Sequence, residues 1–124
     1  KYLIEKQILN PPFYFNLIVG NIANAQADSL HIGLMIKELP KDSFWALGGI
    51  GKVQLQANMI AIAQGGGVRV GLEDNIWLDS RKSKLADNIS LIKRIHELAN
   101  IAERPIMKPK EFGLSGLYNK QKKA

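Results

Sequence analysis

The sequence predicts an α/β fold, because short apolar runs that suit buried strands alternate along the chain with longer segments of helical periodicity. Glycine and proline separate these segments, as they commonly do at the ends of helices and strands. The chain has 124 residues, of which 46% are hydrophobic, so it is large enough to form one domain with its own core.

The amino-terminal third contains the first predicted strand with a helix on either side. Residues 2–9 resemble the end of a helix, which the motif NPP stops because proline cannot continue it. The run FYFNLIVG, residues 13–20, is apolar at nearly every position and predicts a strand covered on both faces. After a polar connection, Asp28 or Ser29 is expected to cap a helix that ends before Pro40.

Two more strands and three helices are predicted in the rest of the chain. FWALGGI, residues 44–50, suits a second buried strand, and residues 53–64 suit a helix that ends at three glycines. VRVGLED, residues 68–74, is expected to form the third strand. A long amphipathic helix is expected over residues 82–102, and a short helix near residues 110–117. The apolar face of the long helix is predicted from steps of three and four residues between Leu85, Ile89, Ile92, Ile95 and Ala99.

This order of strands and helices predicts parallel strands joined by right-handed crossovers. Three strands alone leave a sheet with two unpaired edges, which other strands usually cover. The sequence also begins at Lys1 rather than at a methionine, within a stretch that suits the middle of a helix. We therefore expect residues 1–124 to be one partial domain, whose missing part belongs to another segment or to a partner chain.

Charge and composition limit the function classes. The 17 lysines and arginines outnumber the 11 aspartates and glutamates, for a net charge of +6, and the basic tail at residues 119–124 is expected to be solvated. No basic helix face with aromatic residues and no zinc-finger spacing supports nucleic-acid binding. The chain has no cysteine, no run long enough to span a bilayer and no signal peptide, so we expect a cytoplasmic protein.

The motif GGGVRVGLEDN, residues 65–75, ends an apolar strand pattern on two adjacent carboxylates. Since side chains alternate along a strand, the apolar residues of this motif would share one face, and Arg69, Gly71 and Glu73 would share the other. We expect Gly71 to leave room between Arg69 and Glu73. Asp74 would point away from them unless the strand breaks there, which Asn75 favours.

Two interpretations of these charges stay open on strand geometry alone. In a barrel of parallel strands, Glu73 would lie at the carboxyl-terminal mouth, where active sites are found. Alternatively, Arg69 and Glu73 form an internal salt bridge that fixes the packing, and Asp74 caps the next turn.

Four separated motifs resemble one family of enzymes in the same order along the chain. These motifs are NPPFYFNLIVG, LPKDSFWALGGIGK, GGGVRVGLEDN and ERPIMKPKEFGL. Together they resemble the β-keto acid cleavage enzymes, the family of 3-keto-5-aminohexanoate cleavage enzyme, and the resemblance extends over essentially the whole chain. It implies a zinc-dependent (β/α)8 TIM barrel, usually a homotetramer, of which this chain matches the last three βα units, strands six to eight.

The resemblance also implies a reaction and a site. Members of the family condense a β-keto acid with acetyl-CoA and release acetoacetate and a new acyl-CoA. By the same resemblance, Arg69 and Asp74 are a catalytic pair and Glu73 is a zinc ligand. Zinc with three protein ligands keeps an open position for a keto oxygen. Asp74 would act as a base or orient one, and Arg69 would hold the carboxylate or offset developing charge.

The chain departs from the family pattern at the metal site. The other two zinc ligands of the family form a His-x-His pair, whereas this chain has only His31 and His96, which are far apart. We expect neither histidine to bind zinc. The chain alone is therefore predicted to be inactive unless another polypeptide supplies the missing ligands, and the alternative is a noncatalytic barrel fragment or split subunit that assembles with a complementary chain.

Two glycine-rich segments are weighed as anion sites. GGIGK, residues 48–52, lacks the first glycine and the serine or threonine of a P-loop, yet its place between a strand and a helix leaves open an anion site or a tight turn. The glycines at 65–67 precede a strand, the wrong context for a dinucleotide site, and are expected to end a helix.

Overall fold

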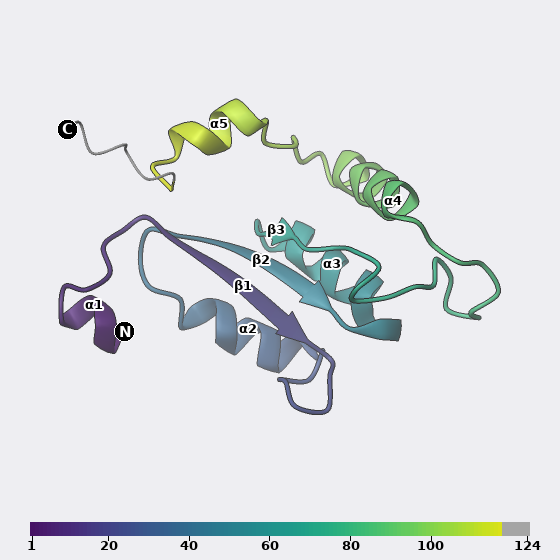
Figure 1. Cartoon of the computed structure of the whole chain (residues 1–124), viewed down its shortest axis with the longest axis horizontal. Helices are drawn as coiled ribbons and strands as arrows, with labels where there is room; N and C mark the ends of the chain where they lie inside the picture. Colours follow the sequence, from purple (N-terminus) through teal and green to yellow (C-terminus); the bar gives the residue numbers. More distant parts are fainter. Residues whose placement is uncertain (118–124) are drawn as a thin grey trace.

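A computed structural model describes residues 1–117, so the predicted basic tail at residues 119–124 lies outside the described residues. The described chain is an α/β structure built on a parallel sheet with the strand order β1-β2-β3 (Figure 1). This architecture confirms the predicted α/β class. The elements are, in chain order, α1 (Tyr2–Glu5), β1 (Phe13–Val19), α2 (Ser29–Lys37), β2 (Ser43–Gly49), the 3-10 turn η1 (Gly51–Val53), α3 (Gln54–Ala63), β3 (Gly67–Val68), α4 (Asn88–Ile101) and α5 (Pro109–Leu114).

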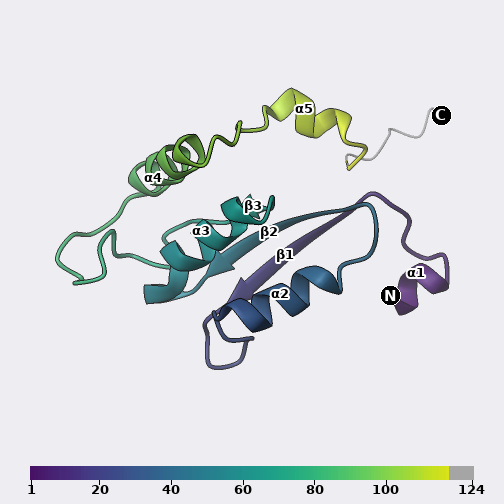
Figure 2. The same ribbon diagram turned by 180° about the vertical axis from the view of Figure 1, so that it is seen from behind.

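The core lies between one face of the sheet and the helices α2 and α3, as two opposite views show (Figures 1 and 2). Val19 of β1 and Leu47 of β2 point to this face and are fully buried. They pack against Ile32 of α2 and against Ala57 and Ala61 of α3. The small side chains of α3 let this helix approach the sheet closely, since a Cβ atom on Gly49 of β2 would lie 2.9 Å from the Cβ of Ala57.

The other face of β1 is only partly covered by the described residues. Tyr14 points to this face and is 47% exposed, although its ring meets Phe112 of α5 edge-on with centroids 6.0 Å apart. Asn16 is exposed as well. The prediction that both faces of this strand are covered is therefore wrong for residues 1–117. Within these residues, the outer edges of β1 and β3 also pair with no strand.

The third strand is much shorter than predicted. Regular pairing was expected over residues 68–74, but β3 covers only Gly67–Val68, which pair with Ala46 and Leu47 of β2. The backbone leaves the sheet after Arg69, because the residues beyond it form a turn that is closed by their own hydrogen bonds.

The long helix begins later than predicted, at Asn88 instead of residue 82. The preceding segment forms a loop in which Trp77 and Leu85 make an antiparallel bridge, and Asp87 then caps the helix through the amide of Ser90. The predicted apolar face is wrong in part, since Ile89 is 66% exposed. None of the helices within residues 1–117, α4 included, combines the length and apolarity of a membrane-spanning segment.

One arginine fastens the end of α3 to the turn before β3. As predicted, the helix ends at the three glycines, and Gly65 adopts a φ of 81° that suits glycine. The guanidinium of Arg104, which follows α4, donates to the carbonyls of Ile62 at 2.9 Å and Gly66 at 2.8 Å. It also reaches the carbonyls of Ala61 and Gly65. These bonds give the carbonyls at the end of the helix a charged donor and place a positive charge at the negative end of its dipole.

Replacement of Arg104 by alanine is therefore expected to lower the free energy of unfolding by about 2 kcal/mol, because several helix-end carbonyls lose a charged donor. Urea denaturation measures this change. Arg81→Ala is the matched control, since Arg81 is exposed and makes no polar contact within residues 1–117. Equal losses in the two variants would contradict this role of Arg104.

Candidate active site

The candidate site forms where β3 leaves the sheet. The backbone amide of Arg69 still donates to the carbonyl of Leu47 at 3.1 Å, and the regular pairing with β2 ends there. The carbonyl of Gly71 then accepts from the amides of Asp74 and Asn75, at 3.1 and 3.2 Å. This turn brings the side chain of Asp74 back toward Arg69, as predicted for a strand that breaks at this point.

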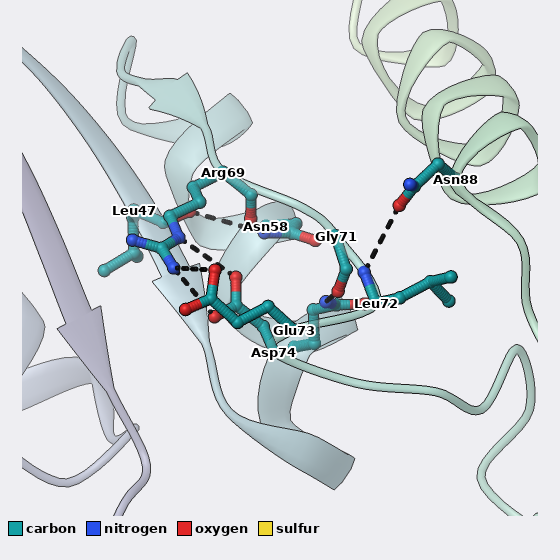
Figure 3. A network of polar contacts seen from close by, with 9 residues as sticks. Leu47, Asn58, Arg69, Gly71, Leu72, Glu73, Asp74 and Asn88 are labelled. Atoms are coloured by element: carbon teal, nitrogen blue, oxygen red, sulfur yellow. Dashed lines mark hydrogen bonds and ion pairs between the residues drawn. The ribbon is translucent and has the colours of Figure 1, made fainter.

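Figure 3 shows the guanidinium of Arg69 beside the two carboxylates that follow it. Its Nε and Nη2 donate to the two oxygens of Asp74 at 3.0 and 3.1 Å, a bidentate pair. Nη2 also lies 3.3 Å from an oxygen of Glu73. The side chain of Asp74 is only 4% exposed, whereas that of Arg69 is 30% exposed and that of Glu73 is 86% exposed. The two adjacent carboxylates therefore differ strongly in their surroundings.

This geometry contains parts of both interpretations of the motif. The salt bridge between Arg69 and Glu73 is present, but it joins residues across a turn and lies at the surface instead of inside a strand. Asp74 caps no turn with its side chain and is instead the main partner of Arg69.

The surroundings of Arg69 favour its protonated, charged form. Hydrogen bonding and charge attraction from Asp74 raise the pKa of Arg69, and Glu73 adds to this effect. Nη1 of the same guanidinium has no acceptor among residues 1–117. Arg69 thus presents donors to an incoming anion while its other nitrogens hold Asp74.

The glycine that makes room for Arg69 is Gly48 of β2, and the expectation for Gly71 is wrong. A Cβ atom on Gly48 would lie 3.3 Å from three carbons of the Arg69 side chain, so Arg69 extends across the face of β2 because Gly48 has no side chain. A Cβ atom on Gly71 would meet only the Asn88 side chain, at 4.0 Å. The glycine on the neighbouring strand, instead of the one within the motif, therefore shapes the site.

Helix α3 holds the backbone of the turn through two fully buried polar side chains that the sequence analysis missed. Asn58 Nδ2 donates to the carbonyl of Arg69 at 3.1 Å and to that of Leu47 at 3.3 Å. Gln54 Nε2 donates to the carbonyl of Gly71 at 3.3 Å. The available signal was the presence of amide side chains on the sheet-facing side of an otherwise apolar helix, because buried amides need partners.

The segment at residues 48–52 also contacts this turn. The amide of Gly51 donates to the carbonyl of Asp74 at 2.7 Å, so this donor is not available to an anion. Across the turn, the amide of Leu72 donates to the side chain of Asn88, the first residue of α4, at 3.3 Å. Contacts from β2, α3 and α4 together determine the position of both carboxylates.

The described residues do not form a complete metal site by themselves. Within residues 1–117, no group of three histidine, aspartate or glutamate side chains lies close enough to hold a metal ion. Both histidines are exposed and lie away from the turn, since His31 pairs with Asp28 at the start of α2 and His96 lies on α4. Glu73, whose carboxylate is exposed, is suited to provide one oxygen ligand.

The sequence of the chain matches one family of known proteins. The sequence model of the beta-keto acid cleavage enzyme family matches residues 1–113. The 3-keto-5-aminohexanoate cleavage enzymes of Fusobacterium nucleatum and Acetoanaerobium sticklandii are 37% and 28% identical to this chain, over 86% and 88% of its length. The 3,5-dioxohexanoate:acetyl-CoA acetone transferase of Paraburkholderia graminis is 28% identical over 89% of the chain.

These relatives are considerably longer than the present sequence. The matched regions cover 39%, 40% and 36% of the three relatives, so the chain spans about two fifths of their length.

The two carboxylates are expected to respond differently to the loss of their charge. Asp74→Asn should lower the free energy of unfolding by about 2 kcal/mol, because it leaves a partly buried guanidinium without its bidentate partner. Glu73→Gln should leave stability unchanged, since exposed ion pairs contribute little. Urea denaturation of both variants measures the difference, and a larger loss for Glu73→Gln would contradict the geometry.

Proposed function

The chain belongs to the beta-keto acid cleavage enzyme family, and we propose that it provides the Arg69, Glu73 and Asp74 side of the active site of such an enzyme. The reaction is the condensation of a β-keto acid with acetyl-CoA to give acetoacetate and a new acyl-CoA. Relatives whose names include acetyl-CoA transfer support the choice of this co-substrate. The observation that carries the proposal is the unequal environment of the two carboxylates, one buried on Arg69 and one exposed beside it.

The fold proposed for the complete protein is a (β/α)8 barrel, in which β1, β2 and β3 are strands six, seven and eight. The parallel order of the three strands supports this placement, as does the helix α3 between β2 and β3. The uncovered face of β1 and the open edges of the described sheet are then the surfaces against which the remaining strands pack. Assembly into a homo-oligomer, the tetramer implied by the family resemblance, is part of the same proposal.

Arg69 is proposed to bind the anionic part of the substrate. Its Nη1 has no acceptor among the described residues, and its raised pKa keeps it charged at any pH at which the enzyme works. Negative charge on a β-keto acid lies on its carboxylate and, as a carbon–carbon bond changes, on the keto oxygen. A guanidinium whose other nitrogens are already held would meet this charge without reorganising.

Asp74 is proposed to act mainly on Arg69. Both of its oxygens accept from the guanidinium, and its side chain is almost fully buried, so it fixes the plane of Arg69. Proton transfer by Asp74 requires one of these bonds to open. Positioning of the arginine is therefore the role that the contacts support best, and general-base action is the second role.

Glu73 is proposed as one of three zinc ligands, and the other two are expected from histidines outside this chain. Its exposure and its single long contact with Arg69 leave a carboxylate oxygen free to bind a metal. Zinc in such a site would act as a Lewis acid that polarises a carbonyl group. The carboxylate of Glu73 would at the same time set the distance between that metal and the guanidinium of Arg69.

The second candidate is a noncatalytic subunit or barrel fragment that assembles with a complementary chain. The observation that favours it is the incomplete cover of the sheet within residues 1–117. Co-expression with a polypeptide that carries the histidine pair separates the two candidates. Gain of zinc and of acetyl-CoA-dependent acetoacetate formation supports the enzyme, whereas a complex without either supports the noncatalytic subunit.

Variants of the three side chains are expected to separate their roles in the full protein, assayed with any polypeptide that co-purifies with it. Arg69→Lys and Asp74→Asn should lower kcat by about 100-fold or more while bound zinc is retained, because the guanidinium loses its fixed geometry. Glu73→Gln should lower the zinc content itself, because a neutral amide is a poor ligand. Acetoacetate formation and metal analysis are the two measurements.

The matched control is Glu97→Gln, which removes the same charge from an exposed residue of α4 that makes no polar contact in the described part of the chain. It should change neither activity nor zinc content. Full zinc and full activity in Glu73→Gln would exclude Glu73 as a ligand.

A further inference from the structure

A second feature of the molecule adjoins the candidate site. A pocket of about 430 Å³, here named the loop pocket, lies between the start of α3, the loop over residues 72–82 and Arg94 of α4. Glu73 and Asp74 form part of its wall, so the pocket opens directly onto the site. Its volume lies in the range of pockets that hold small molecules.

Three cationic side chains line the loop pocket, Lys52, Lys82 and Arg94. No carboxylate within residues 1–117 forms an ion pair with any of them. Cations that share a wall repel one another, so three unpaired cations around one cavity favour an anionic occupant.

Arg94 is the least expected of these cations. Its Nη1 donates to the carbonyl of Leu78 at 2.6 Å and its Nη2 to Gln54 at 3.4 Å, while its Nε is buried and finds no acceptor in the described part of the chain. Removal from water lowers the pKa of Arg94, although arginine still carries its charge at neutral pH. A guanidinium held in this way without a carboxylate partner is costly to the fold, and a bound anion would offset that cost.

Each acidic residue of the pocket wall makes polar contacts within the chain. Asp74 is bound in the bidentate pair, and Glu73 contacts Arg69. Asp79 accepts from the hydroxyl and amide of Ser83 and from the amide of Lys84, at 2.7 to 2.9 Å, and the hydroxyl bond most strongly holds its pKa below the usual range. The bonds to Asp79 come from neutral donors and do not cancel its charge, but with Arg69 included the four cations around the loop pocket still exceed its three carboxylates by one, so the net charge there is positive.

The backbone and the apolar wall restrict the class of ligand further. The amide of Gly51, at the start of the 3-10 turn, already donates to the carbonyl of Asp74, so the contacts to an anion are assigned to the side chains. Leu55, Leu72 and Trp77 make much of the remaining wall apolar. The pocket thus suits a molecule that combines phosphate groups with a long, largely uncharged arm.

We propose that the loop pocket binds the coenzyme A part of the thioester, with Lys52, Lys82 and Arg94 on its phosphates and the pantetheine arm along the apolar wall toward Glu73. The choice of coenzyme A rests on the proposed function, whereas the anionic character of the ligand rests on the unpaired cations. The chain's own side of the barrel would then both bind the co-substrate and contact its reacting end.

Calorimetric titration of the full protein with coenzyme A tests the proposal. The double variant Lys52→Gln/Lys82→Gln should weaken binding about tenfold, because two charge-assisted contacts to phosphate are lost. Pantetheine, which has no phosphate, should bind the variant and the unaltered protein equally. Added salt should weaken the binding of coenzyme A but not that of pantetheine.

The control removes the same charge elsewhere. Lys93→Gln/Lys110→Gln changes two exposed lysines that line no part of the loop pocket, and it should bind coenzyme A as the unaltered protein does. Equal weakening in both double variants, equal loss of pantetheine binding or absence of coenzyme A binding by the unaltered protein would each overturn the proposal. Arg94→Lys is a second variant that keeps the charge but loses the planar donors, and it should weaken binding less than the double variant.

The same titrations separate this proposal from the proposed function. If acetoacetate is never formed but coenzyme A binding depends on Lys52 and Lys82, the pocket assignment stands and the reaction is wrong. If acetoacetate is formed while the double variant binds coenzyme A normally and loses affinity for acetoacetate, the cations bind the keto acid and the pocket assignment is wrong.

Discussion

The bidentate pair between Arg69 and Asp74 is the interaction on which the geometry of this region depends. It joins a residue that still belongs to the sheet with one that has already left it, so it closes the turn that ends β3. A charged pair of this kind is strongest where water is excluded from one partner and the geometry is close. Both conditions are met, since Asp74 is buried and Gly48 leaves the space through which Arg69 extends.

The same pair explains why adjacent acids have different properties. Once Asp74 is turned inward onto the guanidinium, the preceding residue must point outward, and Glu73 becomes accessible. The turn thus gives the two carboxylates different roles. Asp74 holds the guanidinium of Arg69, and Glu73 keeps an oxygen that can bind a ligand. The loop pocket continues from this point, because the backbone that positions Glu73 also forms its wall.

The sequence predicted well those helices and strands for which the apolar pattern and the residues at both ends agree. The strand FWALGGI and the helix after it lie within one or two residues of their predicted bounds, since apolar periodicity and the glycines at both ends agree. The third strand was predicted too long, because VRVGLED has strand-like composition while the carbonyl of Gly71 closes a local turn. Leu85 matched the helical period of the segment after it, yet it pairs with Trp77 in a loop.

The site residues named from family resemblance do lie together, but their supports could not be read from the sequence. Gly48 of β2 leaves room for Arg69, and Gln54 and Asn58 of α3 donate to backbone carbonyls of the turn. Only the packing of the helix on the sheet reveals these contacts. In the apolar pattern that predicts the helix, the two amides are only interruptions. Their function depends on partners that are 11 to 17 positions away in the chain.

The amide of Asn58 has a consequence for how this region tolerates change. It bridges the carbonyls of Leu47 and Arg69, so the lateral spacing of two strands at their tips is set by a side chain from a helix. The oxygen of the same amide is buried and has no partner within residues 1–117, so only the two bonds from its nitrogen orient it. A change on the buried side of α3 that removed this amide would therefore reach the charged residues at the ends of the strands through the backbone.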